Sequence, residues 1–207
     1  MSGGLVLYPT ETYYALGCLA NAPAAVANIY KVKDRQKSHP LPMVAASQEQ
    51  AARACSLDAV PTSLLQFWPG PLTVLVPRRQ DSALASQLAN HEGLVAMRVS
   101  SHPQVNRLCT VTNFPLTASS ANISGCPPAR TTGALADALM QRLIEYAPNS
   151  GVLVPETEQN IPAGGSPSTI VRPLDGNRLM VHRLGAISLQ SLQDAGFTCI
   201  VEPHATS

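Results

Sequence analysis

Residues 93–125 read GLVAMRVSSHPQVNRLCTVTNFPLTASSANISG, and their order of apolar and polar runs indicates an architecture. GLVAMRV is typical of a strand, HPQVNRLCTV of a helix, and FPL of the start of a second, buried strand. The stretch ends in TASSANISG, residues 117–125, in which seven of nine residues are small and none is charged. A strand, a helix and a second strand in succession are typical of an α/β sheet.

The same alternation continues on both sides of this stretch. Further strands are predicted at residues 5–8, 41–46, 72–77 and 151–154, and further helices at 22–33, 47–55, 61–68, 131–146 and 188–196. Ser47 is the expected N-cap of its helix, residues 9–18 a long turn, and residues 155–167 a surface loop or a segment that orders on binding. Residues 168–184 are typical of a hairpin that turns at Asp175-Gly176-Asn177. We predict one α/β domain over residues 1–200, with a twisted, mixed parallel/antiparallel open sheet flanked by helices, and a flexible tail at 201–207.

Composition excludes several classes of protein. The formal net charge of +1 argues against a protein that coats nucleic acid non-specifically. No run approaches the roughly 20 apolar residues of a membrane span, and the start lacks the basic region of a signal peptide, so we expect a cytoplasmic protein without membrane contact. The five cysteines form no C-x-x-C pair and the histidines no i, i+4 pair. We therefore expect neither a zinc site nor a disulfide framework.

Polar residues follow apolar strands in four segments, which are residues 9–14, 31–41, 117–125 and 164–171. Open α/β sheets bind ligands at such strand ends. Lysine and arginine in the second segment, with hydroxyls and backbone N–H groups in the third, suit an anion such as phosphate. The two common glycine-rich nucleotide-binding motifs, G-x-x-x-x-G-K-[ST] and G-x-G-x-x-G, are both absent from the sequence. A serine hydrolase is less consistent with the sequence, because the G-x-S-x-G motif of such enzymes is also absent. Two alternatives remain open: the serines and threonines could form local turn hydrogen bonds, and the lysines and arginine of the second segment could belong to a solvated helix end.

Seven motifs resemble the YrdC-like family of threonylcarbamoyl-AMP synthases, in the same order and over residues 4–196. They are PTETYYALGC, KVKDR followed by HPL, FWPGPLTVLV, VAMRV, SSANISG, PSTIV and HRLGAIS. The resemblance implies a short, single-domain enzyme that combines L-threonine, bicarbonate and ATP, releases pyrophosphate, and makes threonylcarbamoyl-AMP. It implies Mg²⁺ bound with ATP rather than in a protein cage. It also implies, as partner, a transferase complex that modifies adenosine in tRNA; whether RNA is bound directly is left open.

The resemblance also implies roles for residues. The K-x-R and S-x-N elements, expected to hold the acyl-adenylate, fall on Lys33, Arg35, Ser120 and Asn122. Lys33 and Arg35 would neutralise the phosphates of ATP, and Ser120 and Asn122 would fix the α-phosphate and the carbamoyl group. Ser168 and Arg183 would contact the nucleotide. The threonine pocket is expected from Thr10, Thr12, His39, Arg98 and Ser119, with Arg98 on the carboxylate.

Two other functions are weighed against the synthase. A carbamoyl-adenylate-forming relative would belong to a larger chain with zinc-finger and acylphosphatase-like regions, which this sequence lacks. A non-catalytic RNA-binding or ribosome-maturation module is less consistent with Ser120 and Asn122, and the few aromatic residues offer little for base stacking. Asp34 and Ala15 depart from the family pattern, and the sequence begins almost at its first strand. We expect these departures to affect activity more than the fold.

Overall fold

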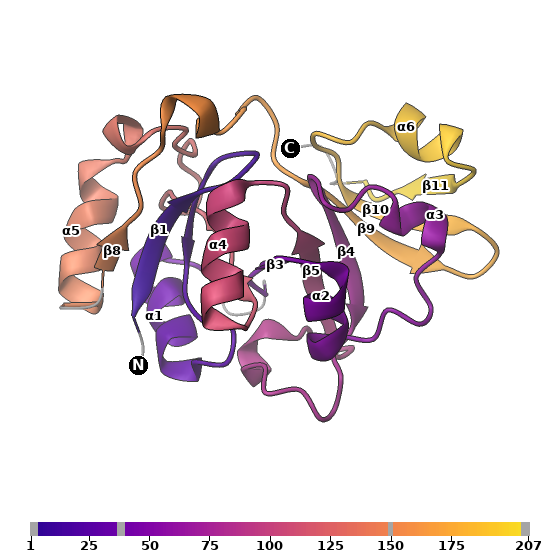
Figure 1. Ribbon diagram of the computed structural model, residues 1–207, viewed down its shortest axis with the longest axis horizontal. Coiled ribbons are helices and arrows are strands. Elements are labelled where there is room, and N and C mark those ends of the chain that lie inside the picture. Colours follow the sequence, from indigo (N-terminus) through magenta and orange to yellow (C-terminus); the bar gives the residue numbers. More distant parts are fainter. Residues whose placement is uncertain (1–3, 37–39, 149–150, 204–207) are drawn as a thin grey trace.

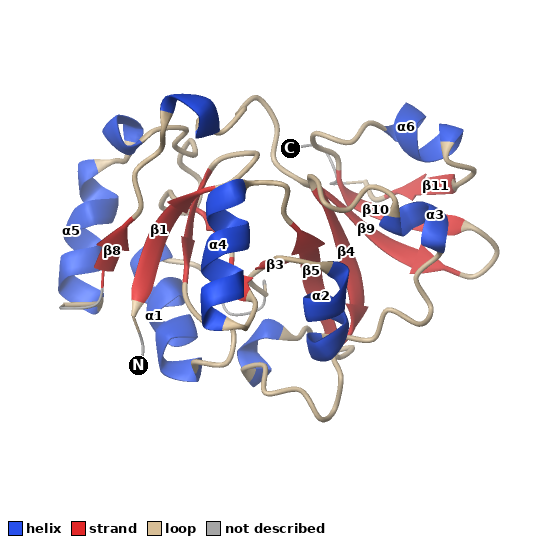
Figure 2. Ribbon diagram, viewed as in Figure 1, coloured by secondary structure: helices blue, strands red, loops and turns tan. Residues whose placement is uncertain are grey.

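The computed structural model describes residues 4–36, 40–148 and 151–203. Its strands and helices alternate, and the strands pair in both parallel and antiparallel fashion, which confirms the mixed α/β class (Figure 1). The strands form two hydrogen-bonded sheets rather than the single sheet expected. The outer helices flank both of them (Figure 2).

The smaller sheet has the strand order β7-β2-β1-β8 and the larger β11-β10-β9-β4-β5-β3-β6. The smaller sheet consists of β1 (Leu5–Pro9), β2 (Tyr14–Gly17), β7 (Ser119–Ser120) and β8 (Gly151–Leu153). The larger consists of β3 (Met43–Ala45), β4 (Leu72–Pro77), β5 (Leu94–Val99), β6 (Leu116–Thr117), β9 (Thr169–Leu174), β10 (Arg178–Arg183) and β11 (Thr198–Val201).

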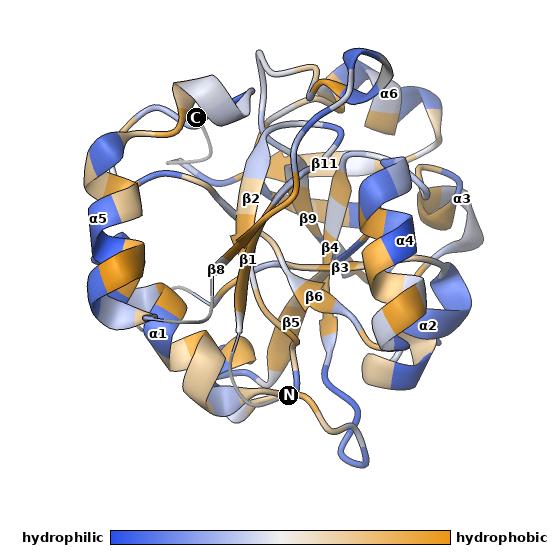
Figure 3. Cartoon of the chain, turned by 60° about the vertical axis from the view of Figure 1, so that its left-hand side comes forward, coloured by the Kyte–Doolittle hydropathy of each residue, from blue (hydrophilic) through white to orange (hydrophobic). Residues whose placement is uncertain are grey.

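Helices cover the sheets from several sides. They are α1 (Pro23–Lys33), α2 (Gln48–Ala54), α3 (Thr62–Leu65), α4 (Pro103–Thr112), α5 (Asp137–Tyr146) and α6 (Leu189–Asp194), with short 3₁₀ turns at Ser86–Leu88, Thr132–Ala134 and Glu158–Asn160. Helix α4 packs on β1 and β3, α2 on β3 and β5, and α1 against α5 beside the smaller sheet (Figure 1). The strands are mainly apolar in colour, whereas the helices mix hydrophilic and hydrophobic residues (Figure 3). None of the helices within the described ranges has the length and apolar character needed to cross a membrane.

The two sheets meet at the segment that carries β6 and β7. Leu116 and Thr117 pair with β3, whereas Ser119 and Ser120 pair with β2, so one short segment passes from one sheet to the other. Thr117 N–H donates to the Cys18 carbonyl at 2.9 Å, and the Tyr8 hydroxyl donates to the Thr117 carbonyl at 2.7 Å. A Cβ atom at Gly17 would lie 1.9 Å from the same Thr117 oxygen. This close approach requires glycine, and it brings the small-residue segment against β2.

Two local predictions are wrong, two are confirmed, and one strand was not expected. Residues 9–18 are not one long turn, because Tyr14–Gly17 forms β2 antiparallel to β1. All four residues of β2 are buried, so the strand has no polar alternation that would have revealed it. The helix expected over 131–146 starts at Asp137, after a 3₁₀ turn. The Ser47 hydroxyl caps α2 by accepting from Gln50 N–H, and the β9–β10 hairpin turns as predicted. Strand β11 was not expected, and residues 204–207 lie outside the described ranges.

Candidate functional site

A cavity of about 630 Å³ lies where the two sheets meet. Its walls come from the β1–β2 turn, the segment after α1, the strands β3, β4 and β5, the crossing segment 118–122, and the strands β9 and β10. Nine of the eleven expected site residues line it: Thr10, Thr12, Arg35, Arg98, Ser119, Ser120, Asn122, Ser168 and Arg183. The fold therefore gathers segments that are far apart in the sequence around one space.

Two expected residues do not line the cavity. His39 lies outside the described residues. Lys33, at the end of α1, is 1 % exposed, and its ammonium donates to the backbone carbonyls of Ser120 and Asn122 and to Asn122 Oδ1 at 3.1 Å. Burial, and to a smaller extent the charge of Arg35, lowers the pKa of Lys33 to about 7. Lys33 therefore contacts the Ser120–Asn122 turn from behind.

The Ser120–Asn122 turn is held by its own side chains as well. The Ser120 hydroxyl donates to Asn122 Oδ1 at 2.6 Å, and the Asn122 amide donates to the carbonyl of Cys126. Ser119, in the same segment, is 3 % exposed and pairs with Leu16 of β2. The side chains of Ser120 and Asn122 therefore line the cavity in a fixed arrangement.

Three arginines place positive charge around the cavity. Arg35 follows α1, Arg98 lies on β5, and Arg183 ends β10. Burial, and to a smaller extent the charges of Arg98 and Arg35, lowers the pKa of Arg183 to about 10; burial also lowers the pKa of Arg35. The three charges are thus close enough to act on one another in a poorly solvated space. Such a cavity attracts anions, and guanidinium groups suit phosphate and carboxylate in particular.

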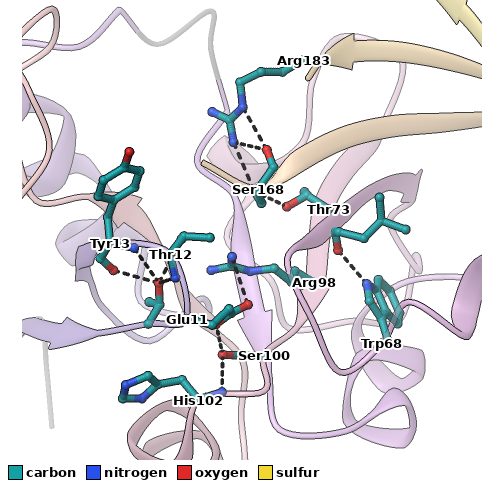
Figure 4. A network of polar contacts seen from close by, with 12 residues as sticks. Glu11, Thr12, Tyr13, Trp68, Thr73, Arg98, Ser100, His102, Ser168 and Arg183 are labelled. Atoms are coloured by element: carbon teal, nitrogen blue, oxygen red, sulfur yellow. Dashed lines mark hydrogen bonds and ion pairs between the residues drawn. The ribbon is translucent and has the colours of Figure 1, made fainter. Parts of the chain in front are cut away.

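The Arg183 guanidinium is held by Ser168, the residue before the neighbouring strand β9. Its Nε and Nη2 donate to the Ser168 carbonyl at 3.1 and 2.8 Å, and Nη2 also donates to the Ser168 hydroxyl at 3.1 Å (Figure 4). The Ser168 hydroxyl in turn lies 2.9 Å from the Thr73 hydroxyl on β4. Thr73 was not predicted as a site residue. It is the one polar residue in the apolar run LTVLVP, and this could have indicated a role in the site.

Glu11 is a second residue that the sequence reasoning missed. Its carboxylate Oε1 lies 3.1 Å from Arg98 Nη1, and its Oε2 accepts from the Ser100 hydroxyl at 2.5 Å. The side chains of Arg98 and Glu11 are only 6 and 12 % exposed. Glu11 is the one carboxylate in the PTETYY segment, which was the signal available.

The Thr10 hydroxyl stabilises the turn between β1 and β2. Its hydroxyl donates to the Tyr13 carbonyl at 2.7 Å and accepts from Thr12 N–H at 3.2 Å. The local turn hydrogen bonds that were left open therefore account for the Thr10 hydroxyl, while Thr10 and Thr12 both still line the cavity.

The segment after β8 forms one wall of the cavity. Gly164 N–H donates to the Thr12 carbonyl at 2.7 Å. The Glu156 carboxylate accepts from the Tyr14 hydroxyl at 2.6 Å and from Thr132 N–H at 3.1 Å. Gly165 and Pro167 then line the cavity. This segment is tied to the β1–β2 turn, so the cavity has a defined wall on this side.

No cluster of three or more His, Cys, Asp or Glu side chains that could hold a metal ion occurs among the described residues. The donors around the cavity are instead arginines, hydroxyls and amides. That set suits a phosphorylated ligand and a carboxylate.

Comparisons with known proteins agree with the geometry. The Sua5/YciO/YrdC family model, described as telomere recombination, matches residues 1–185. The threonylcarbamoyl-AMP synthase of Xanthomonas axonopodis pv. citri (strain 306) is 37% identical over 142 residues, which cover 67% of this chain and 75% of that protein. The threonylcarbamoyl-AMP synthase of Marinobacter nauticus is 38% identical over 132 residues, covering 63% of this chain and 69% of that protein.

Solved structures share the fold. Sua5 of P. abyssi complexed with L-threonine superimposes with a TM-score of 0.80 at 26% identity, over 97% of this chain and 56% of the Sua5 chain. This chain therefore spans little more than half of the Sua5 protein. E. coli YciO superimposes with a TM-score of 0.69 at 20% identity, over 92% of this chain and 87% of YciO, which supports the fold alone.

Proposed function

Because the chain belongs to the Sua5/YciO/YrdC family, we propose that it is a threonylcarbamoyl-AMP synthase, which joins L-threonine, bicarbonate and ATP and releases pyrophosphate. The observation that carries this proposal is the cavity that three arginines and the Ser120–Asn122 turn line together. The cavity offers arginines for a triphosphate and a carboxylate, and an uncharged turn for the carbamoyl group that lies between them. The Sua5 structure with L-threonine supports the amino acid as one ligand.

The proposed reaction needs no nucleophile from the protein. The amine of threonine takes up carbon dioxide derived from bicarbonate, with loss of water and a proton, and becomes a carbamate. A carbamate oxygen then attacks the α-phosphorus of ATP, the bond to the β-phosphate oxygen breaks, and pyrophosphate leaves with the electron pair. The protein contributes alignment of the two substrates and stabilisation of the charge that develops on the phosphates.

Each side chain has a place in this scheme. Arg35 and Arg183 neutralise the phosphates, Arg98 binds the threonine carboxylate, and Ser120 and Asn122 fix the α-phosphate and carbamoyl group. Lys33 acts through the turn whose carbonyls it binds. Mg²⁺, bound to the triphosphate, would add positive charge at the leaving group.

The reactivity of the proposed product implies a partner enzyme that accepts the threonylcarbamoyl group. An acyl-adenylate is a reactive mixed anhydride, so a second enzyme must accept the threonylcarbamoyl group before water does. We infer that this acceptor is a transferase complex that modifies adenosine in tRNA, and that the protein works in the cytoplasm where its substrates are found.

Pyrophosphate release tests the proposal. It should require ATP, L-threonine and bicarbonate together, and Arg35→Ala should lower kcat/KM at least about 100-fold because one phosphate-binding cation is lost. Arg79→Ala removes an arginine from an exposed ion pair with Asp81, outside the cavity, and should leave the rate unchanged. Release that does not depend on threonine, or an Arg35→Ala variant with full activity, would refute the assignment.

A further inference from the structure

A buried ion pair connects the two sheets beneath the cavity. Glu11 lies on the turn between β1 and β2, and Arg98 lies on β5 of the larger sheet (Figure 4). Their contact, Oε1 to Nη1, is 3.1 Å long, and both side chains are nearly inaccessible to water. Arg98 is also a residue of the cavity wall, whereas Glu11 is not.

Glu11 is held firmly on the side away from Arg98. The Ser100 hydroxyl donates to Oε2 of Glu11 at 2.5 Å, and the same Ser100 oxygen accepts from His102 N–H at 3.2 Å. The backbone carbonyl of Glu11 accepts from Ala163 N–H at 3.3 Å. The carboxylate of Glu11 is therefore held by the segment 100–102, and its backbone by the loop at Ala163.

The contact uses a small part of the Arg98 guanidinium. A guanidinium has five N–H donors in a rigid plane, and its contact with Glu11 is a charge contact at Nη1: neither Nη1 nor Oε1 has a hydrogen-bond partner among the described residues. Removing a counter-ion from a buried arginine is strongly unfavourable, and the charges of Arg35 and Arg98 both reach Arg183 in the same cavity. Glu11 thus compensates the charge of Arg98 without enclosing its whole donor plane.

We propose that Glu11 is a positioning residue that orients the Arg98 guanidinium toward the carboxylate of the amino-acid substrate. The inference rests on the proposed function, in which Arg98 receives that carboxylate. Glu11 itself does not touch the substrate. It fixes the plane of the guanidinium from one side so that the remaining donors meet the substrate without reorganisation.

The test compares two ligands that differ only at the carboxylate group. Isothermal titration measures binding of L-threonine and of L-threoninamide, in which the carboxylate is an amide, to the wild-type protein and to Glu11→Gln. The amide of Gln keeps the size of Glu11 but removes its negative charge, so the ion pair with Arg98 is lost. We expect Glu11→Gln to bind L-threonine at least about tenfold more weakly and L-threoninamide almost unchanged, so that the preference for the carboxylate collapses.

Two further variants control the experiment. Asp81→Asn removes a carboxylate from an exposed arginine pair and should bind both ligands as the wild type does. Ser100→Ala keeps the charge of Glu11 but removes the hydrogen bond that holds Oε2, so it should shift the preference in the same direction by a smaller factor. This variant preserves the test if Glu11→Gln fails to fold.

The outcomes separate this inference from the proposed function. Equal or tighter binding of L-threonine to Glu11→Gln would show that Glu11 is a bystander or a competitor, and would overturn the inference while wild-type pyrophosphate release still supports the synthase. A parallel loss for both ligands would show a general structural role and also overturn it. A wild-type protein that binds no L-threonine and releases no pyrophosphate would overturn both.

Discussion

At the scale of single residues, the sequence located most of the site but not how its members act. Lys33 was expected at the phosphates of ATP, yet its ammonium contacts the carbonyls of the Ser120–Asn122 turn. A sequence motif places a side chain near a site but does not say which of several oxygens a long, flexible side chain will reach. Glu11 received no role from the sequence because a lone carboxylate beside threonines is typical of an ordinary turn. Its ion-pair partner Arg98 is apparent only in the fold.

The buried Lys33 predicts a pH dependence of stability. Its pKa falls from an ordinary 10.5 to about 7 in the folded protein. Between these values the unfolded chain binds a proton that the folded chain lacks, so the free energy of unfolding rises with pH, by up to about 1.4 kcal/mol per pH unit for this one group. Below pH 7 both states are protonated and this contribution no longer changes.

Urea denaturation of the wild type and of Lys33→Met measures this effect. The stability of the wild type relative to the variant should increase from pH 7 to pH 9. A difference between the two proteins that is constant over that range would show that Lys33 stays protonated in the fold.

At the scale of elements, longer apolar runs, hairpins and caps were predictable, whereas the short strands of the crossing were not. The hairpin of β9 and β10 and the cap at Ser47 follow local rules, and the structure contains both. Strand β2 carries no alternation because both of its faces are covered. Its neighbour β7 has two residues, too short for any periodic signal. The crossing between the sheets is therefore formed by elements that the sequence pattern cannot resolve.

Gly17 tests the crossing directly. An added methyl group would meet the Thr117 carbonyl at 1.9 Å, so Gly17→Ala must push β2 and the crossing segment apart. We expect the free energy of unfolding to fall by about 1–3 kcal/mol or more. Gly151→Ala, in β8, has no neighbouring atom within 4 Å and should stay within about 0.5 kcal/mol of the wild type. Similar denaturation midpoints for the two variants would contradict the account of the crossing.

At the scale of the whole molecule, the cavity exists because two sheets meet along one short segment. The order of seven motifs was sufficient to indicate the family and the ends of the strands that face the site. It could not show that the strands divide into two sheets, because pairing depends on contacts between residues more than a hundred positions apart, such as Ala15 with Ser120. TASSANISG forms the crossing between the sheets: the Thr117 carbonyl lies against Gly17, and Ser119, Ser120 and Asn122 line the cavity.

The central claim is that this cavity makes threonylcarbamoyl-AMP. The most direct measurement is mass spectrometry of the products formed from ATP, L-threonine and carbon-13 bicarbonate. The account predicts an adenylate that contains both threonine and the carbon-13 label, and none when threonine is omitted. A labelled carbamoyl-adenylate without threonine, or no labelled adenylate at all, would contradict it.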